Sequence, residues 1–287
     1  MILLNFANFS IKSKKEPIKL KKIEHLSEIY NLYDTFIIDL WGVMHDGVRV
    51  HQGAIKAIDN LQKNNKKFIF LSNAPRPSES VIRFLKKINM EEKYLKNVMT
   101  SGEAALKSLR NKKFGTKFFH LGPERDASLF KGIEKNKSGL NDCEFILCTG
   151  LFDEHEKDLD YYKNLLKNSI SKKLVCTNPD LIVHREKKAE YCAGTIAEIF
   201  EVLGGVSVYF GKPHKEVYDI ILKKDEKTLI IGDNLNTDIK GANNLNIDSL
   251  FITSGVHRFE FNKKNELMNL LKKYKVSSKY FQEMLIW

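Results

Sequence analysis

The sequence predicts an α/β fold built on a parallel sheet. Apolar runs of strand length alternate with stretches of helical spacing, so residues 36–88 read strand, helix, strand, helix. That order favours right-handed crossovers between parallel strands. Asp39, Ser72 and Asp233 each fall at the end of a predicted strand, and sites in such sheets lie at the carboxyl ends of the strands. One site at that edge is therefore expected.

The elements of the first third follow from the spacing of the apolar residues. Residues 23–32 have helical spacing, and the apolar run over 36–40 predicts a buried strand. A short hairpin that turns at Asp46-Gly47 is expected over 43–50. The ranges that follow are a helix over 53–64, a strand over 67–71 and a helix over 78–88.

The rest of the chain suggests one domain interrupted by another. A second series of strands and helices covers 117–121, 144–148, 159–166, 174–177 and 195–203. A helix over 216–223 and a strand over 228–231 come next, and 250–252 is expected to be the last strand. The expected division is an N-terminal arm over 1–22, a core over 23–102 and 207–287, and an inserted α/β unit over 103–206.

Composition indicates a globular protein without a membrane segment. The 287 residues are 43% hydrophobic and 29% charged, and no apolar run approaches the roughly 20 residues that span a bilayer. The N-terminus lacks the basic start and the cleavage site of a secretory signal. The four cysteines contain no C-x-x-C pair, which favours reduced, mostly buried thiols in a cytoplasmic protein.

The formal net charge of +11 has two interpretations. One is a nucleic-acid partner, and the other is a lysine-rich composition spread over solvated faces. The lysines occur as doublets on expected helices, such as Lys86-Lys87 and Lys223-Lys224, and no arginine-rich block occurs. We therefore expect neither a nucleic-acid nor a membrane partner, and the positive field favours small anionic substrates.

Four short motifs carry the chemically informative residues. In chain order they are Asp39-Leu40-Trp41-Gly42, Ser72-Asn73, Gly211-Lys212-Pro213, and Gly232-Asp233 with Asp238. Each alone has a plain structural reading: a turn, a surface lysine or, for Asp238, the N-cap of a helix over 239–242. Carboxylates at two strand ends, together with a lysine, indicate metal-assisted phosphoryl transfer.

With these motifs in this order, the chain resembles the haloacid dehalogenase (HAD) superfamily of hydrolases from about residue 33 onward. It is most similar to class IIA, the NagD-like and 4-nitrophenylphosphatase-like phosphatases that carry a large C2-type α/β cap. The resemblance implies a Rossmann-like parallel-sheet core with the cap inserted over 103–206. It also implies a small phosphorylated metabolite as substrate, and it allows a homodimer because such caps often provide dimer surfaces.

The resemblance implies a role for each motif residue. Asp39 would be the nucleophile that forms an aspartyl-phosphate, and Lys212 would offset the repulsion between it and the phosphate. Ser72, Asn73 and Lys212 would bind phosphate oxygens. Residues of the cap near the turn Asn178-Pro179-Asp180 would shape the substrate pocket. The candidates there are Asn178, Asp180 and Arg185.

The cofactor that the resemblance implies is Mg²⁺. Its protein ligands would be Asp39, the backbone carbonyl of Trp41, and Asp233, because a hard divalent ion prefers a few carboxylates and other oxygens. Asp238 would bind through water or orient the ligands around the ion.

Trp41 departs from the family pattern. Family phosphatases usually have an aspartate here that protonates the leaving oxygen, and losing a general acid typically costs about 10²–10⁴ in rate. Three readings are open: substrates with good leaving groups, a proton from His45 or a cap residue, or loss of catalysis. We favour a Mg²⁺-dependent phosphatase of small metabolites. The alternative is a catalytically weak or inactive phosphate-binding or regulatory relative.

Overall fold

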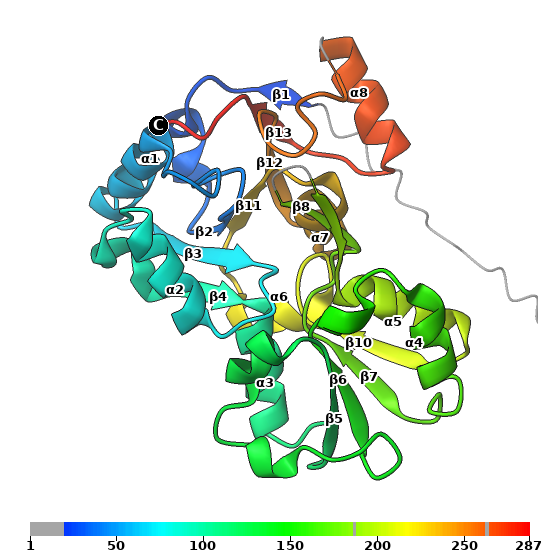
Figure 1. Ribbon diagram of the computed structural model, residues 1–287. Coiled ribbons are helices and arrows are strands. Elements are labelled where there is room, and N and C mark those ends of the chain that lie inside the picture. Colours follow the sequence, from blue (N-terminus) through cyan, green and yellow to red (C-terminus); the bar gives the residue numbers. More distant parts are fainter. Residues whose placement is uncertain (1–19, 186–187, 262–263) are drawn as a thin grey trace, which may run out of the picture.

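The computed structural model describes residues 20–185, 188–261 and 264–287, and two parallel sheets organise this part of the chain (Figure 1). The larger sheet has the order β1 (Lys21–Lys22), β13 (Tyr280–Gln282), β12 (Asp248–Ile252), β11 (Thr228–Gly232), β2 (Thr35–Asp39), β3 (Lys67–Ser72) and β4 (Val98–Thr100). The smaller sheet has the order β10 (Val206–Tyr209), β7 (Lys173–Cys176), β6 (Phe145–Cys148) and β5 (Phe118–Leu121). A separate antiparallel hairpin pairs β8 (Ile182–Arg185) with β9 (Lys188–Tyr191). The predicted α/β class with parallel sheets is confirmed.

Helices cover both sheets. Their bounds are α1 (Gln52–Lys63), α2 (Ser78–Lys87), α3 (Ser101–Arg110), α4 (Leu159–Leu166), α5 (Ala193–Val202), α6 (Lys215–Ile221), α7 (Lys240–Leu245) and α8 (Lys264–Lys273). Apolar residues of α1 and α2 join one core cluster with the larger sheet, and those of α4 and α5 join another with the smaller sheet. A cluster built around α3 and α6 contains residues of both sheets. These two helices therefore pack where the sheets approach each other.

Strand β2 explains why the first apolar run is continuous. Phe36 and Ile38 point into the cluster that contains α1, and Ile37 points into the cluster that contains α6. Alternate residues of a strand face opposite sides of the sheet, and both sides are covered here. The strands predicted over 36–40, 67–71 and 228–231 are confirmed by β2, β3 and β11.

Two local predictions were wrong, and a third holds in reduced form. Residues 23–32 form two short 3₁₀ turns, Leu26–Glu28 and Tyr30–Leu32, rather than one helix, because the segment instead bonds the C-terminal residues 286–287. The hairpin expected over 43–50 is reduced to one antiparallel bridge, between His45 and Val50, which encloses the turn at Asp46-Gly47. The strand at 250–252 is not the last one, since β13 adds to the sheet after α8.

The residues that form each sheet can be compared with the expected division of the chain into core and inserted unit. The strands between 118 and 209 make the smaller sheet and the separate β8–β9 hairpin, and the strands before 101 and after 227 make the larger sheet. Of the expected arm, residues 1–19 lie outside the described part, and Lys21–Lys22 pair with β13. The four cysteines are buried, and none of them forms a disulfide with another, as expected. No helix among the described residues is long and apolar enough to cross a membrane.

Candidate active site

Asp39 ends β2, and its neighbours in the sheet bring the other strand-end residues close. β2 lies between β11 and β3, with Asp39 opposite Leu71. Ser72 ends β3, and Asp233 directly follows β11. All three line one cleft of about 1900 Å³, so the strand ends form a single site as the sheet order predicts.

Lys212 is the centre of the site. Its Nζ donates to Asp39 Oδ1 at 2.6 Å and to Asp238 Oδ1 at 2.7 Å, and its side chain is buried. Its backbone N–H donates to Asn73 Oδ1 at 2.7 Å. Gly211 precedes it with φ +129°, and a Cβ there would lie 2.8 Å from that same Asn73 oxygen. Burial alone would lower the pKa of Lys212, but Asp238 and Asp39 more than offset this and raise it.

Three carboxylates share this one ammonium group. Oxygens of Asp39, Asp233 and Asp238 all lie within 4.8 Å of one another. Burial, followed by the charges of Asp39 and Asp238, raises the pKa of Asp233 well above its usual range. Burial is also the main cause that raises the pKa of Asp238 to about 6, although Lys212 opposes it. The cluster thus brings together more carboxyl groups than Lys212 alone can neutralise, and this oxygen donor set fits a hard divalent cation such as Mg²⁺.

The loop after β2 is held tightly against this cluster. Gly42 has φ +82°, and a Cβ there would lie 2.1 Å from Asp233 Oδ2, so only glycine fits. Asp233 Oδ2 also accepts from the Val256 backbone N–H at 2.8 Å. The peptide that joins Trp41 to Gly42 therefore lies beside the acidic cluster.

Asp238 does not cap a helix. It lies inside the single π-helical turn Leu235–Ile239, whose N-cap is Asn234. The Asn234 side chain accepts from the Asn236 backbone N–H at 2.9 Å, and Asp238 points to Lys212 instead. The helix N-cap reading of Asp238 was wrong: its Oδ1 binds Lys212, its Oδ2 accepts from the Asn234 backbone N–H at 3.2 Å, and α7 has Ile239 as its N-cap.

Two expected cap residues reach the same cleft. Asn178 and Asp180 both line it, and the Asp180 N–H donates to Asn178 Oδ1 at 3.1 Å. Asn73 Nδ2 donates to Asp180 Oδ1 at 3.0 Å, and burial raises the pKa of Asp180. Arg185 is in β8, and its side chain is outside the described structure.

Trp41 and His45 differ in their access to the cleft. Trp41 lines the cleft with a partly exposed side chain. His45 is buried and edge-on to Phe84, and its Nδ1 accepts from the Gly47 backbone N–H at 3.0 Å. Burial lowers the pKa of His45 to about 4, so it is neutral near pH 7. His45 is thus poorly placed to supply the missing proton.

Family models match both halves of this site. One, described as haloacid dehalogenase-like hydrolase, matches residues 36–134, and another, described as HAD-hydrolase-like, matches residues 209–269. The solved structure of a haloacid dehalogenase-like hydrolase from Brucella suis 1330 is 26% identical with a TM-score of 0.75, covering 92% of this chain and 100% of that one. This chain belongs to the haloacid dehalogenase-like hydrolases.

Other HAD relatives carry activity names. An acid sugar phosphatase of Staphylococcus haemolyticus is 26% identical over 239 residues, covering 79% of this chain and 88% of the relative. That of Staphylococcus aureus strain USA300 is 24% identical over 248 residues, with 79% and 89% covered. The structure of 4-nitrophenylphosphatase from Thermotoga maritima shares the fold at 20% identity and a TM-score of 0.69, covering 88% of this chain and 95% of that one.

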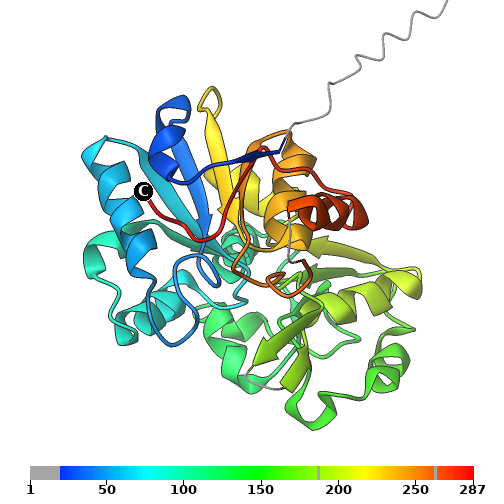
Figure 2. The same ribbon diagram turned by 90° about the horizontal axis from the view of Figure 1, so that it is seen from above.

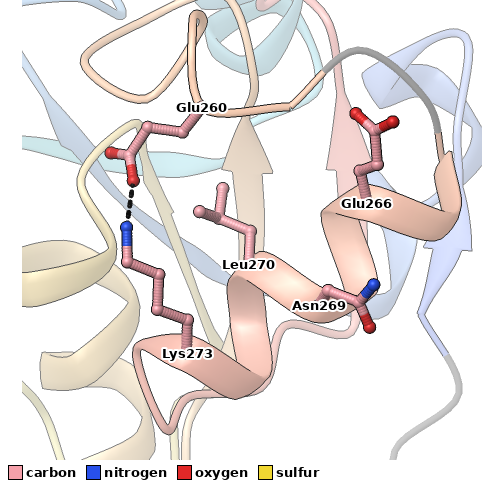
Figure 3. A pocket seen from close by; sticks show the side chains of 5 residues that line it. All are labelled: Glu260, Glu266, Asn269, Leu270 and Lys273. Carbon is pink, nitrogen blue, oxygen red and sulfur yellow. Dashed lines mark hydrogen bonds and ion pairs between the residues drawn. The ribbon is translucent and has the colours of Figure 1, made fainter.

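A second hollow of this HAD chain is separate from the site. It lies beside α8 and is lined by Glu260, Glu266, Asn269, Leu270 and Lys273 (Figure 3). The carboxylate of Glu260 pairs with Lys273 at 2.8 Å across it. None of the residues that line it takes part in the cluster around Lys212.

The sequence did not reveal the segment after β12. Val256, Arg258 and Phe259 line the cleft, and Val256 N–H bonds Asp233. Ser254-Gly255 directly behind a predicted strand was the available signal, since the other strand ends also lead into the site.

Proposed function

We propose that this HAD chain is a Mg²⁺-dependent phosphatase of small phosphorylated metabolites, with Asp39 as the nucleophile. The observation that carries this proposal is the buried ammonium of Lys212 between Asp39 and Asp238, with Asp233 completing the acidic cluster. Simple ligand binding would not require a carboxylate so closely paired at the end of an interior strand of the sheet. The names of the phosphatase relatives support the same activity.

The proposed reaction has two steps on Asp39. Its carboxylate attacks phosphorus, the bond to the leaving oxygen breaks, and water then hydrolyses the aspartyl-phosphate. Lys212 reduces the repulsion between the two anions and binds a phosphate oxygen. The Ser72 hydroxyl, which lines the cleft, would bind another. The side chain of Asn73 holds the Lys212 backbone and Asp180, so its own contribution to the phosphate would come from its backbone N–H.

In this proposal, Mg²⁺ would be held by Asp39, the Trp41 carbonyl and Asp233. Asp238 would orient the ligands around the ion. Bound there, the ion would neutralise charge on the phosphate in the transition state. The residues themselves fix Asp39 in place before the substrate arrives. Lys212 holds one Asp39 oxygen at 2.6 Å, which leaves the other oxygen to serve as metal ligand or nucleophile.

The leaving group must depart without help from Trp41. The indole cannot transfer a proton, and His45 is buried and neutral. Two cap carboxyls that line the cleft have pKa values raised by burial, Asp126 and Asp180. Asp126 pairs with Arg76, whereas Asp180 accepts from Asn73 Nδ2 at 3.0 Å, so Asp180 is the better candidate for a proton donor. We therefore propose that the enzyme acts best on esters with good leaving groups, such as aryl or acyl phosphates.

The remaining parts of the proposal concern the domain organisation, the cellular location and the oligomeric state. Residues 23–102 and 207–287 would form the core, and residues 103–206 the C2-type cap that closes over it. We place the protein in the cytoplasm because its four buried cysteines form no disulfide with one another. A homodimer through the cap rests on the family resemblance alone, and sedimentation would test it.

The deciding test is phosphate release from 4-nitrophenyl phosphate with Mg²⁺ and with chelator. Wild type should release phosphate only with the ion, and Asp39→Asn should abolish release, because an amide cannot form the acyl phosphate. Asp160→Asn is the control, since Asp160 is exposed on α4 away from the cleft. A wild-type protein that binds phosphate but releases none from any activated ester would favour the non-catalytic alternative. Activity retained in Asp39→Asn would refute the nucleophile.

A further inference from the structure

A buried histidine that does not line the cleft bonds two groups outside the proposed reaction. His257 lies in the loop after β12 and is 3% exposed. Its Nε2 accepts from the Leu235 backbone N–H at 3.1 Å, and its Nδ1 lies 2.6 Å from Glu260 Oε1. An imidazole nitrogen that accepts a hydrogen bond carries no proton, so Nδ1 carries it and donates to Glu260. The two bonds together define one neutral tautomer of His257.

Glu260 is held in place by α8 and the residue that follows it. Its Oε2 accepts from Lys273 Nζ at 2.8 Å, and its Oε1 accepts from the Tyr274 hydroxyl at 3.0 Å (Figure 3 shows the bond to Lys273). Burial alone would raise the pKa of Glu260, but the hydrogen bonds that it accepts lower this pKa to about 2. The Tyr274 ring also packs edge-on against the His257 ring, at 4.8 Å between centroids. A carboxylate therefore faces Nδ1 and keeps the imidazole oriented with Nε2 towards Leu235.

The N–H group that His257 binds belongs to the start of the π-helical turn that contains Asp238. The first N–H groups of a helical segment have no partner within it. Here the Asn234 N–H donates to Asp238 Oδ2 at 3.2 Å, and the Asn236 N–H donates to Asn234 Oδ1 at 2.9 Å. The Leu235 N–H lies between them in sequence, and its acceptor comes from another segment. His257 therefore ties the start of this turn to the loop after β12.

The two residues before His257 contact the second carboxylate of the turn region. The Val256 N–H donates to Asp233 Oδ2 at 2.8 Å, and a Cβ on Gly255 would lie 2.0 Å from the same oxygen. In Figure 2 the loop after β12, in orange, lies near the middle of the molecule, and α8, in red-orange, lies farther out. One short segment thus contacts Asp233 through Val256 and the turn of Asp238 through His257.

We propose that His257 is a positioning residue of the divalent-cation site: held by Glu260, it fixes the start of the π-helical turn against the loop after β12. This bond keeps Asp233 and Asp238 in the arrangement that Mg²⁺ requires. The inference rests on the proposed function. Because His257 does not line the cleft, its removal should lower the affinity for the ion and leave the chemical step intact at saturating Mg²⁺. Losing a group that orients metal ligands typically costs about 10–100-fold in metal affinity or activity.

The test measures the binding of Mg²⁺ alone by titration calorimetry, without substrate. His257→Leu removes both hydrogen bonds and should weaken Mg²⁺ binding by about tenfold or more. His257→Gln keeps an acceptor for the Leu235 N–H and should recover most of the affinity. His120→Leu is the matched control, because His120 is also 3% exposed and bonds Thr149 instead of the turn. It should unfold at lower urea than the wild type and still bind Mg²⁺ with the wild-type affinity.

Turnover separates binding of the ion from chemistry. With 4-nitrophenyl phosphate, His257→Leu should need about tenfold more Mg²⁺ for half-maximal turnover, and its kcat at saturating Mg²⁺ should approach that of the wild type. A kcat that stays low at saturating Mg²⁺, with unchanged metal affinity, would contradict a role in positioning the metal ligands.

The calorimetric outcomes distinguish this inference from the proposed function. Equal Mg²⁺ affinity in His257→Leu and the wild type would overturn the inference, whether or not the protein is a phosphatase. Equal weakening in His120→Leu would overturn it too, since a general loss of structure would then be the cause. Failure of His257→Gln to recover affinity would refute the bond to Leu235 as the cause. Weaker Mg²⁺ binding by His257→Leu in a protein that releases no phosphate would contradict the phosphatase proposal and support the positioning role.

Discussion

Replacing Lys212 by methionine should destabilise the protein far more than removing a lysine from the surface. Lys212 Nζ is 2.7 Å from Asp238 Oδ1, and both side chains are almost fully buried, at 3% and 1% exposed. Lys215 Nζ is also 2.7 Å from its partner, Asp219, but those side chains are 70% and 52% exposed. The two ion pairs therefore differ in burial and not in length, so Lys215→Met is a matched control.

The expected difference follows from burial. Removing one partner of a buried pair typically costs about 3–5 kcal/mol of the free energy of unfolding, because the remaining charge is buried without compensation. An exposed pair between residues i and i+4 contributes about 0.3–0.5 kcal/mol. Without Lys212, three clustered carboxylates would have no cation, so the upper part of the larger range is expected.

Urea unfolding in the presence of chelator measures both variants. With a slope of about 3 kcal/mol per molar, the midpoint of Lys212→Met should fall by roughly 1–2 M. The penalty should be smaller at pH 5 than at pH 8. A carboxyl group whose pKa is higher in the folded than in the unfolded protein takes up protons on folding. Its stabilising contribution is therefore present at low pH and is lost as pH rises through the folded pKa. For Asp238 in the wild type, that folded pKa is about 6.

The double variant Lys212→Met with Asp238→Asn provides an internal check. It removes one positive and one negative charge together, so it should recover part of the lost stability. Equal midpoints for Lys212→Met and Lys215→Met would refute the reasoning. So would a penalty for Lys212→Met that is larger at pH 5 than at pH 8.

Three further predictions concern the metal requirement, the loss of folding stability at acid pH and the missing proton donor. Asp233→Asn should raise the Mg²⁺ concentration needed for half-maximal turnover, because one anionic ligand is gone; an unchanged requirement would remove Asp233 from the metal site. Burial lowers the pKa of His120 to about 4, so the folded protein holds it neutral and loses stability as pH falls from about 6.5 towards 4. His120→Gln should reduce the pH slope of the unfolding free energy there by up to one proton, about 1.4 kcal/mol per pH unit, and an unchanged slope would contradict this. Wild type should cleave aryl phosphates far faster than alkyl phosphates, and Trp41→Asp should raise alkyl turnover by about tenfold or more; a flat dependence on leaving-group pKa in the wild type would mean that another residue donates the proton.

The parts of the site that the sequence predicted are those set by strand order. An apolar run that ends in a polar residue places that residue at the edge of a parallel sheet, so Asp39, Ser72 and Asp233 could be placed together in advance. The contacts between Asn73 and Lys212 could not be predicted. These residues are 139 positions apart, and only the fold brings them to 2.7 Å.

Local spacing also failed where distant contacts compete with it. Residues 23–32 have the apolar spacing of a helix, but His25 and Leu26 bond the carbonyls of Trp287 and Ile286 at the other end of the chain. Asp238 has the local setting of an N-cap, but a buried lysine from another segment binds it. In both cases tertiary bonds outweigh a local preference.

The structure also explains how a tryptophan can occupy the position of a proton donor without disturbing the charged residues. Gly42 lies tightly against Asp233, so the backbone just after Trp41 is positioned by a contact that the Trp41 side chain does not make. Asp39 and Asp238 each pair with Lys212 below the surface, and removing any one of the three leaves a buried charge with a partner fewer. The Trp41 side chain instead lies at the cleft opening, where it is 46% exposed. A substitution at residue 41 is therefore expected to change the supply of the proton and the binding of the ligand. It leaves the charge balance of the acidic cluster unchanged, because other residues set that balance.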